Sequence, residues 1–241
     1  MLKWYWVGKN FTGNFGDVLT PKLLDHFKIP YTFVSDPREE FDAMCIGSIA
    51  RWAKKGTEVF GSGFMSKNHD PNIEANYRFV RGPISRDMII NAGGECPEIY
   101  GDPALLLPLF CNESKKEYDI GIIPHVAHYE SIKNEFNNEF VINLFTNNAL
   151  DVVSEITKCR MVISSSLHGI IAANAYGIPA AWVDFGPIKG DDMKFEEYFM
   201  SVGVVNPIKT TISNPIFYKG SYDTTAINEI FLNFSKELRS K

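Results

Sequence analysis

Cysteine is scarce in this sequence. The 241 residues contain four cysteines, and no two of them (Cys45, Cys96, Cys111, Cys159) stand in C-x-x-C spacing. This excludes a zinc knuckle, a paired redox site and a disulfide-rich scaffold. We expect all four to be ordinary buried thiols.

The chain has no excess of positive charge. It carries 24 Lys and Arg against 29 Asp and Glu, a formal net charge of -5, and its pI is about 5.6. No broad basic field is therefore available to hold nucleic acid or to coat an anionic membrane. An anionic ligand has to be bound locally.

Long hydrophobic runs are missing as well. The longest, residues 170–185, is broken by Asn174, Gly177 and Pro179 and is shorter than the ~20 residues that a membrane-spanning helix needs. Residues 1–7 hold one lysine and a strand-length apolar run, which is too little for a signal peptide. We expect a soluble, cytoplasmic protein without a transmembrane segment, with peripheral association at the inner face of the membrane as the alternative.

What the sequence does have is alternation. Residues of the hydrophobic set make up 45% of the chain, and short β-type runs alternate with helical patterns, which is typical of parallel α/β architecture. The expected strands are 3–7, 31–34, 43–46, 58–60, 77–80, 98–100, 118–123, 140–145, 161–164 and 180–185. The expected helices are 18–27, 48–54, 83–92, 131–136, 149–158, 168–176, 195–202 and 225–238.

A polar, charge-rich passage at residues 108–117 separates two such series and predicts a linker. We place a domain boundary near residue 115. The resulting domains, 1–115 and 116–241, would be two Rossmann-like halves whose strand ends face each other across a cleft.

The strongest candidate site lies where the strand at 161–164 runs into the helix after it. The junction reads Ser164, Ser165, Ser166 and continues with Leu167, His168 and Gly169. Unpaired N–H groups, hydroxyls and the positive end of the helix dipole meet there, which suits an anion. His168 would lie beside that anion. We favour a functional role for it over that of a structural histidine.

Two acidic residues also follow expected strands. Asp17 ends the glycine-containing segment 8–17, in which Asn14 and Gly16 stand, and Asp102 follows Gly101. Glycines allow a tight turn that presents N–H groups, and an aspartate there either caps a helix or faces a ligand. Both interpretations stay open for both aspartates.

Four further residues are candidates for ligand contact. Arg81 and Arg86 bracket the start of the helix at 83–92, where a guanidinium fork fits phosphate or carboxylate; solvent exposure is the alternative for Arg86. His125 and His128 follow the strand at 118–123. They lack the partner ligands of a zinc site, so contact with a ligand or sugar is the better interpretation.

Together these segments resemble the polysaccharide pyruvyl transferases. The resemblance spans roughly residues 10 to 200, in motifs that are individually short but correctly ordered. They are Asn14-Phe15-Gly16-Asp17, Gly61-Ser62-Gly63, Arg81 to Ser85, Gly101-Asp102-Pro103-Ala104, Ser166-Leu167-His168-Gly169-Ile170-Ile171-Ala172 and Gly177-Ile178-Pro179.

The resemblance implies a fold similar to compact two-domain GT-B glycosyltransferases. It also implies transfer of pyruvate from phosphoenolpyruvate to a sugar diol of a capsular or other surface polysaccharide precursor, as a ketal, with release of phosphate. Neither a metal nor an organic cofactor is needed. Phosphoenolpyruvate is the co-substrate, and the partner is a saccharide acceptor that is free, polymeric or lipid-linked. The second half would bind phosphoenolpyruvate and the first half the acceptor.

On this hypothesis His168 is the general acid, and Asp17 or Asp102 is the base for the sugar hydroxyls. The donor phosphate would be held by Arg81, Arg86, Ser164, Ser165, Ser166, Leu167 and Gly169. The acceptor would be held by Asn14, Gly16, His125 and His128.

One departure bears on the donor. Several members of the family have an arginine directly before the Leu-His pair, where this chain has Ser166. Two alternatives therefore accompany the main hypothesis: a compact GT-B glycosyltransferase that uses a nucleotide sugar, and a non-catalytic glycan-binding or assembly protein.

Overall fold

The computed structural model describes residues 1–9, 12–188 and 190–240. Its larger sheet has five strands, all parallel, in the order β3-β1-β4-β5-β6. The segment 8–17 expected to form a glycine turn includes Asn10 and Phe11, which lie outside the described residues. The strands are β1 (Leu2–Tyr5), β3 (Tyr31–Val34), β4 (Ala43–Met44), β5 (Glu58–Phe60) and β6 (Asn76–Phe79).

A second sheet has four strands in the order β11-β10-β9-β7. Only the pairing of β10 with β11 is antiparallel. The predicted α/β class is thus confirmed. The strands are β7 (Tyr118–Ile123), β9 (Cys159–Ser164), β10 (Ala180–Trp182) and β11 (Phe217–Tyr218), and a short antiparallel pair joins β2 (Gly13–Asn14) to β8 (Phe145–Thr146).

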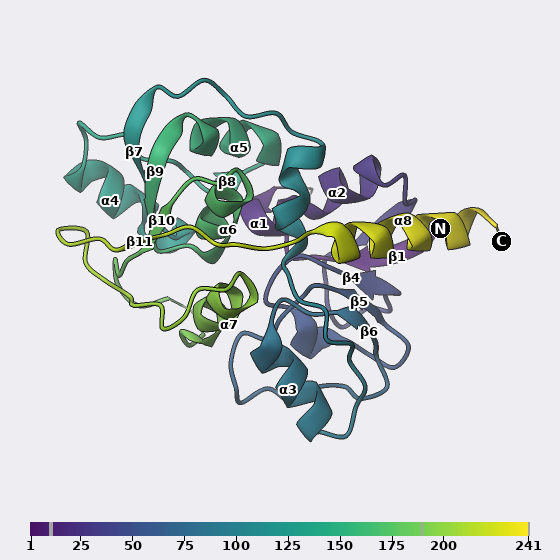
Figure 1. Ribbon diagram of the computed structural model, residues 1–241. Coiled ribbons are helices and arrows are strands. Elements are labelled where there is room, and N and C mark those ends of the chain that lie inside the picture. Colours follow the sequence, from purple (N-terminus) through teal and green to yellow (C-terminus); the bar gives the residue numbers. More distant parts are fainter. Residues whose placement is uncertain (10–11, 189, 241) are drawn as a thin grey trace.

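Helices cover both sheets (Figure 1). In the first half they are α1 (Phe15–Val18), α2 (Thr20–His26), η1 (Ala50–Trp52), α3 (Pro83–Asn91) and η2 (Pro103–Leu109). Those that follow are η3 (Val126–His128), α4 (Tyr129–Glu135), α5 (Ala149–Thr157), α6 (Leu167–Ala175), α7 (Met193–Ser201) and α8 (Thr225–Arg239).

Local sequence explains where the best-marked helices begin and end. Pro83 occupies the first turn of α3, where its missing N–H costs nothing, and Gly93 follows the helix at φ +88°. Every residue of α6 is buried, in keeping with its position against η2, α5, β9 and β10. A helix that is apolar on all sides belongs in the interior.

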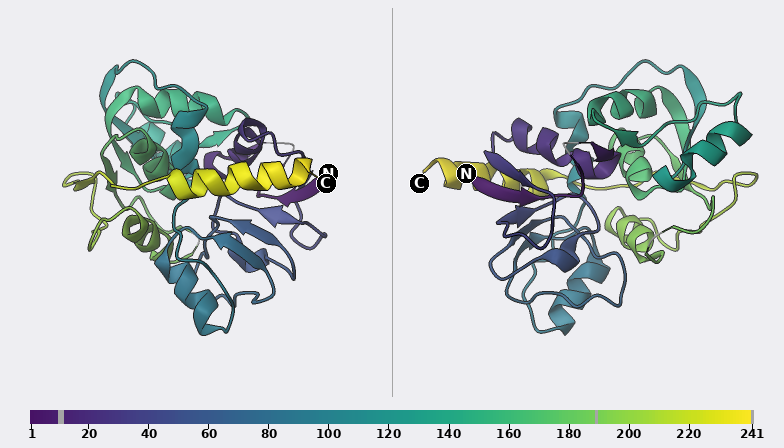
Figure 2. Two further views of the ribbon diagram at one scale, coloured as in Figure 1. Left: turned by 45° about the vertical axis from the view of Figure 1, so that its right-hand side comes forward. Right: turned by 180° about the vertical axis from the view of Figure 1, so that it is seen from behind.

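The last helix of the second half packs on the first sheet. Helix α8, the last in the sequence, lies along the first sheet and not the second (Figures 1 and 2). Its Phe231 is fully buried and stacks on Phe27 and Phe60 at centroid distances of 5.0 and 5.2 Å. Ser235 donates a hydrogen bond of 2.6 Å to the carbonyl oxygen of Phe27. The core of the first sheet therefore includes side chains from the end of the chain.

Most expected elements are present, and the strands at 31–34, 58–60 and 118–123 have the expected bounds. Two strand predictions were wrong. In 98–100 only Tyr100 pairs, as an isolated bridge to Val80, and in 140–145 the pairing is a bridge at Val141 plus the first residue of β8. The expected linker at 108–117 begins inside η2.

Two further expectations concern the cysteines and the membrane. All four thiols are free, but Cys111 is only partly buried, unlike the other three. Within the ranges that the model describes, none of the helices has the length and apolar character required for a membrane crossing.

Candidate functional site

The carboxyl ends of the strands in both sheets meet at one place. His168, in the first turn of α6 after β9, has its Nε2 3.6 Å from Oδ2 of Asp102, which follows the bridge residue Tyr100 of the first half. The ring of His168 also lies against Gly16, at the start of α1. The structure thus brings His168, Asp102 and the segment Asn14–Asp17 together, at the edge where α/β proteins bind ligands.

The side chains of Ser164 and Ser165 stabilise, by hydrogen bonds, the turn from β9 to α6 (the serine turn, residues 164–166). Ser164 Oγ accepts the N–H of Ser166 at 3.0 Å and lies 2.9 Å from the carbonyl oxygens of Ile123 and Ser166. Ser165 Oγ accepts the N–H of His125 at 2.9 Å. Ser166 precedes the helix without a side-chain capping bond. The start of α6 is therefore fixed in place while its first N–H groups receive no cap from Ser166.

His168 and Asp102 each have an unsatisfied buried atom. Asp102 is completely buried and His168 is 7% exposed. Asp102 Oδ1 accepts the N–H of Ala104 at 2.9 Å, so it caps η2. Its Oδ2 and the Nε2 of His168 have no hydrogen-bond partner among the described residues. Buried polar atoms in this state are rare and call for an explanation, of which a binding role is one.

Gly16 permits the close approach of the imidazole. A β-carbon at this position would overlap the His168 ring. Beside it, burial raises the pKa of Asp17 to about 6, although the charge of His168 and a side-chain hydrogen bond with Asn14 act in the opposite direction. A carboxyl group with such a pKa can exchange protons near neutral pH.

A buried lysine that the sequence analysis missed belongs to the same neighbourhood. Lys194, on α7, is 8% exposed. Burial, and then the charge of Arg81, lowers its pKa to about 8. Lys194 interacts electrostatically with Asp17 and with His125. A buried lysine is unusual, and the local sequence does not mark it, since Glu196 and Glu197 follow in the same helix.

The guanidinium of Arg81 donates its hydrogen bonds to other groups of the protein. Its guanidinium is completely buried and contacts Glu197 on α7, the Ser48 hydroxyl at 2.7 Å and the Phe64 carbonyl oxygen at 2.9 Å. Burial raises the pKa of Glu197, and Arg81 opposes that shift. In the structure Arg81 therefore joins α7 to the first sheet and does not present itself to an anion, contrary to the expected role.

Arg86 and the two histidines after β7 lie in different places. Arg86 is half-buried on α3 and donates to the Cys96 carbonyl oxygen at 3.1 Å, and no contact within the described residues connects it to His168. His125 and His128 have ring centroids 6.1 Å apart. Burial, followed by Lys194, lowers the pKa of His125. Nδ1 of His128 is buried without a hydrogen-bond partner in the described ranges.

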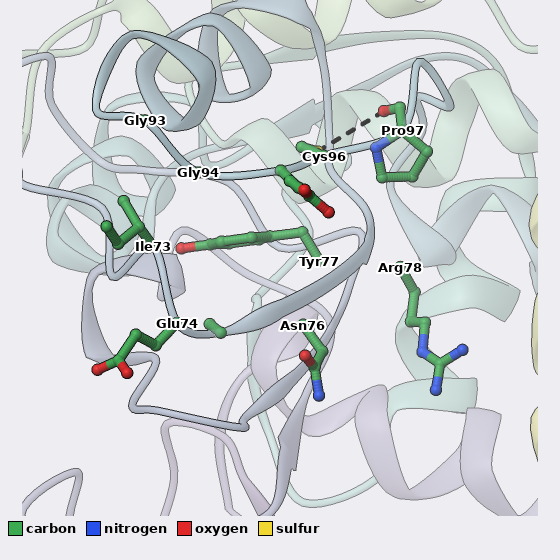
Figure 3. A pocket seen from close by; sticks show the side chains of 11 residues that line it. Ile73, Glu74, Asn76, Tyr77, Arg78, Gly93, Gly94, Cys96 and Pro97 are labelled. Carbon is green, nitrogen blue, oxygen red and sulfur yellow. Dashed lines mark hydrogen bonds between the residues drawn. The ribbon is translucent and has the colours of Figure 1, made fainter.

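No group of three or more His, Cys, Asp or Glu among the described residues is placed to hold a metal ion. A hollow of about 870 Å³ lies elsewhere. It is lined by residues 73–78 at the beginning of β6 and by residues 93–97 after α3 (Figure 3). This is the amino edge of the first sheet, opposite the edge that carries His168 and Asp102.

A second cavity, of about 330 Å³, adjoins the site. Ser165 of the serine turn is one of its lining residues, and the others are Trp182 at the end of β10, residues that follow it, and Lys209. Of the two cavities, this one has the position expected for a ligand site in an α/β protein.

Comparison with known proteins identifies related sequences. Residues 72–186 match the family model "Polysaccharide pyruvyl transferase". That segment includes Asp102 and the whole junction from β9 to α6. The match confirms, for this segment, the resemblance inferred from the sequence.

Two curated proteins are similar over much of the chain. "Uncharacterized protein L143" of Acanthamoeba polyphaga mimivirus is 30% identical over 170 residues, which is 66% of this chain and 59% of that protein. "Succinoglycan biosynthesis protein ExoV" of Rhizobium meliloti is 29% identical over 196 residues, 74% of this chain and 58% of that protein. The matched regions thus span less than two thirds of the curated relatives.

A solved structure shares the fold. It is that of a functionally uncharacterised protein of Klebsiella pneumoniae, with a TM-score of 0.52 at 16% sequence identity, and the match covers 85% of this chain and 89% of that chain. At this identity the similarity supports the arrangement of helices and strands.

Proposed function

Because residues 72–186 match the polysaccharide pyruvyl transferase family, we propose that this chain transfers a pyruvyl group from phosphoenolpyruvate to a saccharide diol. The product is a ketal and phosphate is released. The observation that carries the proposal is the pair formed by His168 Nε2 and Asp102 Oδ2, which are buried 3.6 Å apart and have no hydrogen-bond partner among the described residues. We further propose that the two sheets correspond to the halves of a compact GT-B-like fold.

The donor binds at the start of α6. Phosphoenolpyruvate carries a phosphate and a carboxylate, and the N–H groups and dipole at a helix N-terminus attract such groups. Lys194 adds a buried positive charge from α7. Lys194 supplies the positive charge for the donor that was expected from Arg81, because the guanidinium of Arg81 is paired with Glu197.

His168 delivers the proton that starts the reaction. The proton goes to C3 of phosphoenolpyruvate, so C3 becomes a methyl group and C2 becomes electron-poor. Asp102 stabilises the charged imidazole through Oδ2 and fixes the orientation of the ring, as a carboxylate does for a catalytic histidine. Gly16 leaves room for that ring.

A carboxylate receives the proton of the acceptor. The first sugar hydroxyl bonds to C2 and gives its proton to Asp17, whose pKa of about 6 suits a base at neutral pH. The bond from C2 to the phosphate oxygen then breaks, and the second hydroxyl closes the ketal ring. Of the two hydroxyl protons, one balances the proton placed on the methyl group and the other leaves with phosphate.

The test uses His168→Gln, with His26→Gln as its control because His26 is exposed on α2. Purified protein is incubated with phosphoenolpyruvate and methyl galactosides, glucosides and mannosides. Phosphate release is measured, and the ketal methyl signal is followed by NMR. We expect His168→Gln to lower kcat by at least about 100-fold with an unchanged circular dichroism spectrum, while His26→Gln retains activity. Normal turnover in His168→Gln would refute the acid role.

The pH profile gives a second test. Activity needs Asp17 deprotonated and Lys194 protonated, so kcat/KM should fall below about pH 6 and above about pH 8. Hydrolysis or transfer of a nucleotide sugar, with no reaction of phosphoenolpyruvate, would favour a glycosyltransferase instead.

A further inference from the structure

The cavity of about 330 Å³ beside Ser165 has a lining of its own. It opens at the carboxyl end of β10, and the described residues of the loop that follows, 186–188 and 190–192, form one wall. That loop reaches the first half of the chain. Gly190 packs against Met65, and Asp191 Oδ2 accepts the N–H of Lys67 at 3.4 Å. The cavity therefore lies next to the serine turn, and one of its walls contacts the first half.

The carboxylates among the described lining residues favour a neutral, hydroxyl-bearing ligand over an anion. Three aspartates, Asp184, Asp191 and Asp192, line the cavity together with Lys209. Lys209 Nζ is 2.7 Å from Asp192 Oδ2 and 3.8 Å from Asp184 Oδ2. A doubly or triply charged anion is repelled by this lining, whereas hydroxyl groups can donate to its carboxylates.

Trp182 supplies a flat wall and a donor. It is 3% exposed and stacks on Phe195 at a centroid distance of 4.7 Å. Its indole N–H can donate one hydrogen bond, and its ring centroid lies 5.7 Å from Nζ of Lys209. Pro187 and Ile188 add apolar surface. Apolar walls with a few placed donors and acceptors are the usual composition of a small-ligand site.

We propose that this cavity binds the neutral saccharide that accepts the pyruvyl group, with Asp184 and Asp192 accepting hydrogen bonds from its hydroxyls. The inference rests on the proposed function. It divides the site by charge: the positive start of α6 with Lys194 takes the anionic donor, and the acidic cavity takes the acceptor. The acceptor then lies mainly on residues of the second half, whereas the sequence analysis assigned it to the first.

The test compares two isosteric variants, Asp192→Asn in the cavity and Asp119→Asn on β7 as the matched control. Asp119 is an exposed carboxylate that pairs with Arg160 at the start of the strand, away from the cavity. The KM for the methyl glycoside that turns over fastest and the KM for phosphoenolpyruvate are both measured. Asp192→Asn should raise the glycoside KM about 10-fold, since one hydrogen bond to a charged group is lost, and leave the phosphoenolpyruvate KM within about twofold.

Trp182→Phe keeps the stack on Phe195 and removes the N–H. It should also raise the glycoside KM alone, and thermal melting shows whether it is folded. Charge gives an independent readout: the wild-type protein should prefer a methyl glucoside over the methyl glucuronide by about 10-fold. Asp184→Asn together with Asp192→Asn should reduce that preference.

The outcomes separate the two proposals. An increase in the phosphoenolpyruvate KM alone, or no change in either KM, would overturn the acceptor cavity while leaving pyruvyl transfer intact. If the wild-type protein releases no phosphate with any glycoside, pyruvyl transfer fails, and NMR of glycoside binding tests the cavity directly. Binding that Asp192→Asn weakens and Asp119→Asn does not would support the cavity. Equal binding by all three proteins, or none by the wild type, would overturn it.

Discussion

Replacing Asp17 with asparagine should change how stability depends on pH. In the folded protein burial raises the pKa of Asp17 to about 6, from an ordinary value of 3.8. The folded state therefore holds a proton more tightly than the unfolded chain. As pH rises from 4 to 6 the unfolded chain loses that proton first, so ionisation of Asp17 favours unfolding. Wild-type protein should lose stability over this interval relative to Asp17→Asn, which cannot ionise.

The size of the effect follows from the two pKa values. The folded and unfolded pKa values of Asp17 differ by about 2, which changes the free energy of unfolding by about 3 kcal/mol over the whole titration. Between pH 4.5 and 7 the wild-type protein should lose about 2 kcal/mol of this stability relative to Asp17→Asn. The rest is lost below pH 4.5, where the unfolded carboxyl group already becomes largely ionised. Asp17 is partly exposed, so screening by solvent reduces the expected difference to roughly 1 to 2 kcal/mol.

Urea unfolding at pH 4.5, 5.5, 6.5 and 7.5 measures this difference. The free energy of unfolding of Asp17→Asn minus that of wild type should grow with pH and level off above about pH 7. Asp87→Asn, at an exposed position of α3, should track wild type at every pH. A constant difference across the series would refute the assignment of a raised pKa to Asp17.

Three further changes should affect stability or activity by known mechanisms. Glu197→Gln leaves the buried charge of Arg81 without its counter-ion and should lower the free energy of urea unfolding by about 3 to 5 kcal/mol, less if Arg81 is also replaced by Met. Gly16→Ala should displace the His168 imidazole and, on the proposed mechanism, abolish phosphate release, at a stability cost of about 1 to 3 kcal/mol. Phe231→Ala, in the core under α8, should cost about 3 to 5 kcal/mol, whereas Leu232→Ala, 40% exposed, should cost less than about 1 kcal/mol in the same assay.

The sequence predicts best what local interactions determine. The junction from β9 to α6 was identified because a buried strand, a run of serines and a helix that ends before Gly177 follow one another directly. The strand at 58–60 is likewise bounded by local signals. The expected strand at 98–100 failed because a single bridge, from Tyr100 to Val80, is the pairing available to it.

The parts of the site that depend on distant contacts could not be predicted. Arg81 and Glu197 are 116 positions apart in sequence, and nothing near Arg81 reveals that a carboxylate from another helix neutralises it. Lys194 enters the site because α7 packs on α3. The encounter of His168 with Asp102 depends in the same way on how the two sheets approach each other, and not on any motif.

Helix α8 has a consequence for how the protein is made. During synthesis the five strands of the first sheet leave the ribosome long before residues 225–239, which complete their core with Phe231. Until those residues emerge, Phe27 and Phe60 lack the ring that stacks on both of them, whereas β7, β9 and β10 can already pair. We therefore expect the half synthesised first to mature last, and chains stalled before α8 to depend on chaperones.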